Sequence, residues 1–114
     1  MAIKSFEVSN YTLQAGFKNT GSSPVGTILI QGVLLCNGAD GTRFAIYGLH
    51  PLSPVPAPVY NEASKWGTIF IPFKELPQYV DIVRNEKPVY AYLNSVNPDW
   101  NSISTSTEPV GEGE

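Results

Sequence analysis

The chain has 114 residues, of which 42% are hydrophobic and 15% are charged. This length fits one domain with a single core, and the composition excludes a chain that is disordered throughout. Basic and acidic side chains balance over residues 1–107, and three glutamates in the segment 108–114 produce the net charge of −3. Because clustered basic side chains drive binding to nucleic acids and anionic membranes, the lack of a Lys/Arg cluster argues against both partners.

The start of the chain and its cysteine content indicate a compartment. The first residues contain no apolar run of signal-peptide length, and no stretch approaches the ~18 apolar residues of a membrane helix. Cys36 is the only cysteine, so no disulfide can form within the chain. We therefore expect a cytoplasmic protein.

The first third of the chain alternates between strand and loop patterns. Ile3–Leu13 predicts a strand, whereas Gly16–Gly26 is rich in Gly, Ser and Asn and predicts a loop. Thr27–Cys36 is apolar on both faces, which is typical of a central strand that is covered on both sides. Gly32 within this segment indicates a bulge or a closely approaching backbone.

Turn and proline signals organise the middle of the chain. Asn37–Gly41, "NGADG", predicts a hairpin turn that leads into a strand at Arg43–Leu49. Residues 50–60, "HPLSPVPAPVY", hold four prolines, and in a polyproline conformation residues 51–58 reach roughly 25 Å. We expect a stiff crossover arm that leads to a strand at Trp66–Phe73. An apolar edge of this arm would lie on the sheet or on a neighbouring subunit, and it is formed by Leu52, Val55 and Pro58.

A change of period marks the only helix. Apolar residues recur every three or four positions over residues 76–86, and Pro77 fits the first turn of a short amphipathic helix. Pro88–Asn94 returns to alternation and predicts the last long strand. One face of this strand carries Val89, Ala91 and Leu93, and the other face carries Tyr90 and Tyr92.

These elements predict a mainly β protein. Residues 1–107 should form one small domain, either an antiparallel β sandwich or a partly closed barrel of about five strands. One short helix, at about residues 76–86, precedes the last long strand. Residues 108–114 form an acidic C-terminal tail.

Catalytic and metal-binding residues show no recognisable arrangement. His50 is the only histidine, and catalytic use would require a nucleophile and an orienting carboxylate that no neighbouring motif supplies. Cys36 ends the most apolar strand, where a thiol behaves as a small hydrophobic group. No phosphate-binding glycine pattern occurs. We expect no enzymatic activity, no cofactor and no metal, with an unrecognised active site near His50 as an alternative.

Aromatic residues are the main candidates for a ligand site or an interface. Aromatic rings with a polar group suit both subunit interfaces and stacking on sugars. We expect a non-catalytic domain that self-associates, with a dimer as the first expectation, and that acts through protein–protein contacts. The alternative is a module that binds a small polar ligand or a carbohydrate. The candidate residues are Tyr60, Trp66, Tyr90, Tyr92 and Trp100.

Overall fold

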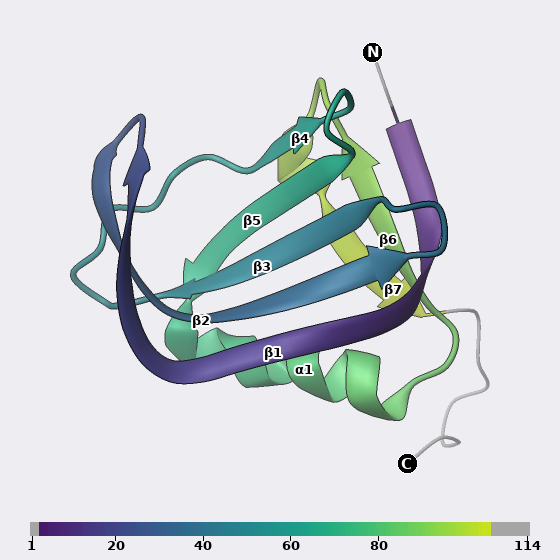
Figure 1. Ribbon diagram of the computed structural model, residues 1–114, viewed down its shortest axis with the longest axis horizontal. Helices are drawn as coiled ribbons and strands as arrows, with labels where there is room; N and C mark the ends of the chain where they lie inside the picture. The colour runs from purple at the N-terminus through teal and green to yellow at the C-terminus, as the bar shows by residue number, and fades with distance from the viewer. Residues whose placement is uncertain (1–2, 106–114) are drawn as a thin grey trace.

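The computed structural model describes residues 3–105, apart from the side chains of residues 17 and 18 (Figure 1). The acidic tail expected at residues 108–114 therefore lies outside the described residues. The described chain is mainly β with one short α-helix, which confirms the predicted class. Its strands are β1 (Ile3–Ser23), β2 (Gly26–Gly38), β3 (Arg43–Leu49), β4 (Val59–Asn61), β5 (Trp66–Pro72), β6 (Val89–Asn94) and β7 (Ser102–Thr105). The helix is α1 (Leu76–Asn85), and the 3₁₀ turns are η1 (Phe73–Glu75) and η2 (Pro98–Trp100).

All seven strands of the described residues belong to one sheet, in the order β4-β5-β3-β2-β1-β6-β7. Neighbouring strands are antiparallel except for the parallel pair β3 and β5. The expectation of about five strands is corrected to seven, and the sheet is open rather than closed. The two additional strands, β4 and β7, have three and four residues, which is too short for a periodic pattern to reveal them.

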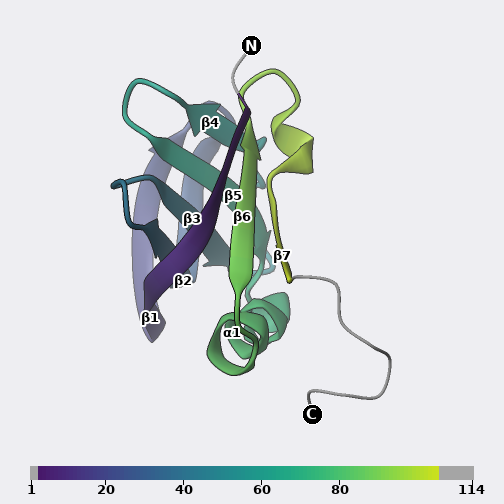
Figure 2. The ribbon, with the colours of Figure 1, turned by 90° about the vertical axis from the view of Figure 1, so that its right-hand side faces the viewer.

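The sheet curls around its core, so that strands from its two ends face each other. Figure 1 shows β6 and β7 behind the strands β2, β3 and β5, and in Figure 2 α1 lies at the lower end of the sheet. Leu93 of β6 packs directly over Gly67 of β5. Nearby, the Asn101 amide Nδ2 donates a hydrogen bond of 3.0 Å to the Val59 carbonyl oxygen. The buried side chains between these strands form one core, whose largest members include Phe44, Leu34, Ile46, Leu76 and Leu93.

Strand β1 is longer than expected, because the predicted loop at Gly16–Gly26 is wrong. Residues 19–23 continue the ladder with β2, and the turn lies at Pro24-Val25. The composition of this segment is typical of a loop, but pairing with β2 overrides this local preference. A register shift between Ala15 and Asn19, together with a φ of 83° at Gly16, marks the sharp bend of β1 in Figure 1.

The proline arm crosses from β3 to β4 and β5, as expected. Since β3 and β5 are parallel neighbours, the chain between them must return along the whole strand length. The predicted apolar edge does not lie on the sheet of its own chain, since Leu52 is 81% exposed and Val55 is also exposed. A hydrogen bond to a serine side chain fixes the rotation of the arm, because the Leu29 N–H donates to Ser53 Oγ at 2.9 Å. Ser53, Pro56 and Tyr60 consequently face inward.

Helix α1 begins and ends within one residue of the predicted range. Pro77 lies in its first turn, and Tyr79, Val80 and Val83 pack against the core. Phe73, in the turn η1 before the helix, crosses β2 at Gly32, where an added methyl group would lie 2.7 Å from the Phe73 ring. None of the helices in the described part of the chain is long and apolar enough to cross a bilayer.

Candidate functional site

The candidate site is the open edge of β1, which we call the free edge and define as residues 8–15. On one side β1 pairs with β2 from Val8 to Ser23. On its other side β1 pairs with β6 only from Ile3 to Glu7. No strand among residues 3–105 pairs with that second side from Val8 onward, so this stretch is available for pairing with another chain.

The orientation of the backbone shows which groups this edge presents. Ala15 faces Gly32 in the ladder, and a methyl group built on Gly32 would lie 3.1 Å from the carbonyl oxygen of Gln14. The Gln14 carbonyl therefore points toward β2. Because successive residues of a strand point their N–H and C=O groups to opposite sides, the backbone groups of Tyr11, Leu13 and Ala15 point to the free edge.

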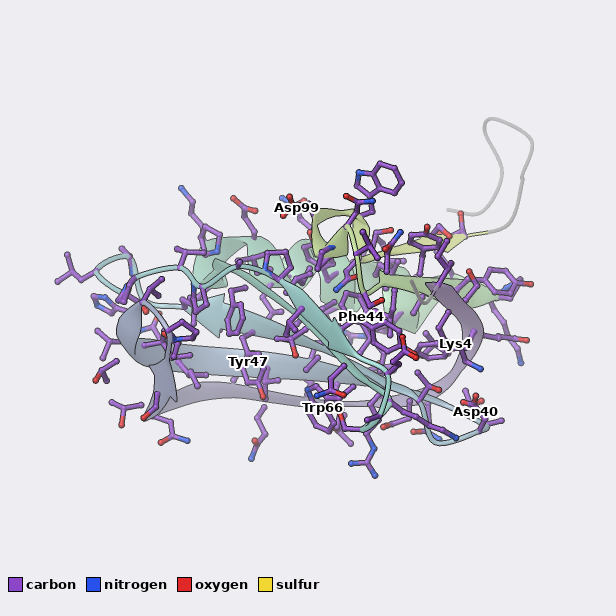
Figure 3. All side chains as sticks on the ribbon, turned by 90° about the horizontal axis from the view of Figure 1, so that it is seen from above. Lys4, Asp40, Phe44, Tyr47, Trp66 and Asp99 are labelled. Carbon is purple, nitrogen blue, oxygen red and sulfur yellow. The ribbon has the colours of Figure 1, made fainter. Side chains whose placement is uncertain are left out.

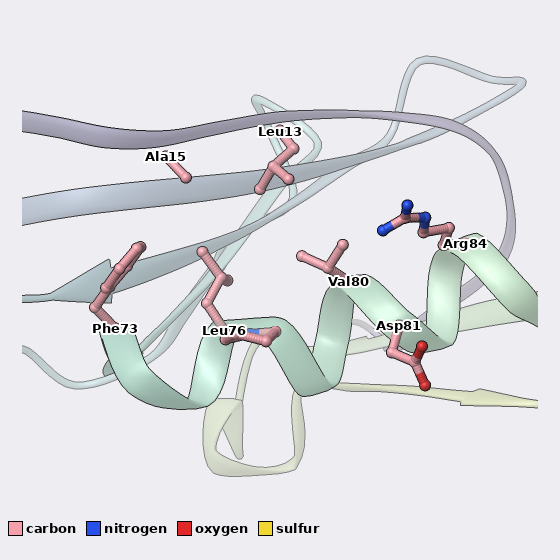
Figure 4. Close-up of a pocket in the computed structure, with 8 residues that line it drawn as sticks. Leu13, Ala15, Phe73, Leu76, Val80, Asp81 and Arg84 are labelled. Atoms are coloured by element: carbon pink, nitrogen blue, oxygen red, sulfur yellow. The ribbon is translucent and has the colours of Figure 1, made fainter.

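An apolar groove lies beside this edge, between β1 and α1. It has a volume of about 370 Å³ and lies under Leu13 and Ala15. Figure 4 shows these two side chains facing the helix, with Arg84 reaching up toward the strand and Asp81 on the outer rim. Leu13 is 44% exposed. The helix and its preceding turn supply Phe73, Leu76, Pro77, Val80, Asp81 and Arg84.

A second, more polar groove continues along the same strand. It has a volume of about 680 Å³ and lies between residues 7–11 of β1 and residues 83–89 at the end of α1. The two grooves together follow β1 from Glu7 to Ala15. Strand and helix therefore supply walls of both grooves, and Arg84 borders each of them.

The free edge differs from the two terminal edges of the sheet. Proteins protect edge strands from unwanted pairing by shortness, proline, charge or cover from a helix or loop. The terminal strands β4 and β7 are short. By contrast, residues 8–17, "VSNYTLQAGF", contain no proline and no charged side chain. The length and composition of this edge fit a strand that pairs with a partner.

Tyr60 and Trp66, two of the aromatic candidates, are separated by the sheet. Tyr60 is buried in the core, because β4 pairs with β5 and turns this side chain inward. Trp66 lies half-buried on the opposite face, where the Arg43 guanidinium lies over its ring, 5.7 Å from the centroid. Beside them, Tyr47 and Phe70 stack on each other with centroids 5.5 Å apart. On this face the ring surfaces are therefore already engaged within the chain.

Tyr90, Tyr92 and Trp100, the other aromatic candidates, lie elsewhere. Tyr90 and Tyr92 are on the outer face of β6, opposite the buried side chains of that strand, and Tyr90 is 37% exposed. Tyr92 accepts a hydrogen bond of 3.2 Å from the Asn94 amide. Trp100 is 61% exposed on η2, and Figure 3 places neighbouring Asp99 on the side of the molecule opposite Trp66. The five candidates thus do not form one cluster.

His50 and Cys36 lie apart in the fold. The Nδ1 atom of His50 accepts the Leu52 N–H at 3.0 Å, and the histidine borders a groove that is otherwise lined by Asn19, Thr20, Leu29, Ile30 and Gln31. Burial raises the pKa of the Cys36 thiol to about 12. Among residues 3–105, no three His, Cys, Asp or Glu side chains are grouped so that they could hold a metal ion.

One ion pair ties the start of β1 to the β2–β3 turn. Lys4 Nζ lies 2.6 Å from Asp40 Oδ2, and Figure 3 shows both side chains at the same end of the molecule. This hydrogen bond from Lys4, together with one from the Thr42 N–H, holds the pKa of Asp40 well below its usual range. The same contact raises the pKa of Lys4. It fixes β1 immediately before the free edge begins.

No protein-family model matches this chain, and comparisons with curated proteins and with solved structures found no significant match.

Sequence reasoning missed the free edge, although part of its signal is present. Tyr11, Leu13 and Ala15 alternate with polar residues, and the stretch carries no charge. This pattern can identify a strand without the proline or charge that hinders edge pairing, but it cannot show which strand lies beside it. The edge is open because β6 pairs with β1 over only a few residues, and this pairing can be seen only in the structure.

Proposed function

We propose that this chain is a non-catalytic β domain that self-associates, and that two copies join by antiparallel pairing of their free edges. The observation that carries this proposal is the unpaired, uncharged stretch of β1 between Val8 and Ala15. Addition of a strand to an open sheet edge is a common mode of protein recognition, in which backbone hydrogen bonds supply affinity. The partner proposed here is a second copy of the same chain.

Two features support a second copy over an unrelated partner. Two identical edge strands can pair antiparallel around a twofold axis, so that each copy contributes the same surface. The ridge of α1 beside the groove carries one acidic and one basic side chain, Asp81 and Arg84. A surface that holds both signs is complementary to itself. The interface proposed here is therefore the free edge, in place of the aromatic residues that the sequence suggested.

Sedimentation equilibrium of the wild-type chain tests the proposal. We expect dimers at high-micromolar concentration, in a reversible equilibrium with monomers. A monomer throughout this range would overturn the proposal and would leave the free edge for another protein.

A pair of variants at Leu13 tests whether the edge itself makes the contact. Leu13→Pro removes an N–H that points away from β2, so the ladder between β1 and β2 stays intact while pairing with a second copy loses a hydrogen bond. Leu13→Ala removes more of the side chain but keeps the N–H. We expect the proline variant to be monomeric and folded, and the alanine variant to retain more association. Equal association of both variants would contradict pairing at this edge.

We also propose a cytoplasmic location, which the single free thiol of Cys36 supports. Carbohydrate binding remains the second candidate function, and the observation that favours it is the exposed indole of Trp100.

A further inference from the structure

We propose that the α1 helices of the two copies also meet in the dimer, and that Asp81 of each copy pairs with Arg84 of the other. This inference rests on the proposed dimerisation through the free edge. It adds a second contact, formed by side chains, which would determine the register of the two edge strands.

The position of α1 makes this contact possible. Figure 1 shows the helix behind the lower part of the sheet, next to β1. Antiparallel pairing of two β1 strands around a twofold axis perpendicular to the sheet would place both helices on the same side of the joined sheet. The two helices would then run antiparallel, one on each side of the axis.

The linings of the two grooves relate positions on β1 to positions on α1. Leu13 borders the groove that ends at Arg84, whereas Tyr11 borders the groove that begins at Val83. Residue Thr12, the centre of the free edge, therefore lies level with the helix near Asp81 to Arg84. A twofold axis through Thr12 would cross the helix pair between these two charged residues, and each would face its opposite in the partner.

The two charged side chains of this ridge, Asp81 and Arg84, can each form a contact with a second copy. Asp81 and Arg84 are both exposed, and Asp81 accepts a hydrogen bond from the Asn85 amide on its own helix. Within the described residues Arg84 forms no ion pair, since Lys4 and Asp40 make the one salt bridge found there. Arg84 extends toward β1 (Figure 4), on the side where the second copy would lie. The apolar side chains of Pro77 and Val80 border the same groove.

Charge reversal on each residue tests the contact. Asp81→Arg leaves two basic residues on the ridge, and Arg84→Asp leaves two acidic residues, so each variant would place like charges opposite each other across the axis. We expect the Kd of each homodimer to rise about tenfold or more, since two symmetric pairs turn repulsive. An equimolar mixture of the two variants should form a heterodimer with a Kd close to that of the wild type.

Native mass spectrometry and sedimentation equilibrium measure these species, because the variants differ in mass. Lys74→Glu is the control, since it reverses a charge at an exposed position of η1 that does not line the groove. We expect this control to dimerise like the wild type.

The outcomes separate this inference from the function on which it rests. Weakened homodimers with a restored heterodimer support the reciprocal ion pairs. Homodimers of unchanged Kd, while Leu13→Pro is monomeric, would overturn the helix contact and leave edge pairing intact. Weakened variants whose mixture shows no recovery would also overturn the reciprocal pairing. A monomeric wild type would overturn both proposals.

Discussion

The substitution Gly67→Ala tests the packing of β6 over β5, which shapes the whole sheet. A Cβ atom on Gly67 would overlap the side chain of Leu93, which is fully buried and would have to shift within a packed core. Overpacking of this kind costs about 1–3 kcal/mol. For a domain of this size, about 2 kcal/mol corresponds to a decrease in Tm of about 10 °C.

A double-mutant cycle sharpens this test. Leu93→Ala alone should cost about 3 kcal/mol, because it leaves a cavity in the core. In the double variant the new methyl group occupies part of that cavity, so we expect a cost lower than the sum of the single costs by about 1 kcal/mol or more. Urea unfolding followed by tryptophan fluorescence gives these free energies. Additive costs within error would refute the contact between β5 and β6.

A matched control comes from the distal part of β1. Gly21→Ala lies in a strand without a positive φ, and its nearest contact would be 3.3 Å from the Ile28 side chain. We expect a change in stability of less than about 0.5 kcal/mol there. A loss as large as that of Gly67→Ala would show that any added methyl group in these strands is harmful.

Three other predictions concern the thiol, the ion pair and the exposed indole. Cys36 should react with a thiol reagent at pH 8 only as fast as the chain unfolds, because its thiol is buried and its pKa is raised to about 12; rapid labelling of the folded chain would refute its burial. Asp40 has a lowered pKa in the folded state, so its contribution to stability is present above its unfolded pKa of about 3.9 and is lost as the pH falls through the folded value. Thermal melts should therefore show Asp40→Asn less stable than the wild type at pH 7, with a smaller difference at pH 2; an equal difference at both pH values would contradict the charge contact. Trp100 lies on η2, which packs against β4 and β6, so Trp100→Ala should leave the Kd of the dimer unchanged, and a monomeric variant would place the interface on the other side of the molecule.

Local signals in the sequence predicted most of the elements, but not their partners. The "NGADG" turn predicted the β2–β3 hairpin correctly, and β5 ends at Pro72, one residue before the end of the predicted strand. The segment around Gly16–Gly26 was misassigned because Gly and Ser favour loops locally, whereas its conformation is set by pairing with β2. Whether β5 lies beside β3 or elsewhere is decided by the length of the proline arm and by contacts distant in sequence.

For the candidate functional residues too, the sequence predicted the face of a strand but not the neighbouring strands. Alternation placed Tyr90 and Tyr92 correctly on one face of their strand, opposite Val89, Ala91 and Leu93. It could not show that Tyr60 turns into the core, because this depends on its pairing with Gly67 of β5. The free edge is likewise a property of neighbouring strands, since it exists only because β6 leaves β1 after Glu7.

Amide hydrogen exchange of β1, measured at low and high protein concentration, tests the central claim most directly. The N–H groups of Thr12 and Gln14 point toward β2 and should be protected at both concentrations. The N–H groups of Leu13 and Ala15 point to the free edge, and we expect them to exchange rapidly in the dilute protein and slowly in the concentrated protein. Rapid exchange of Leu13 and Ala15 at every concentration would contradict pairing through this edge.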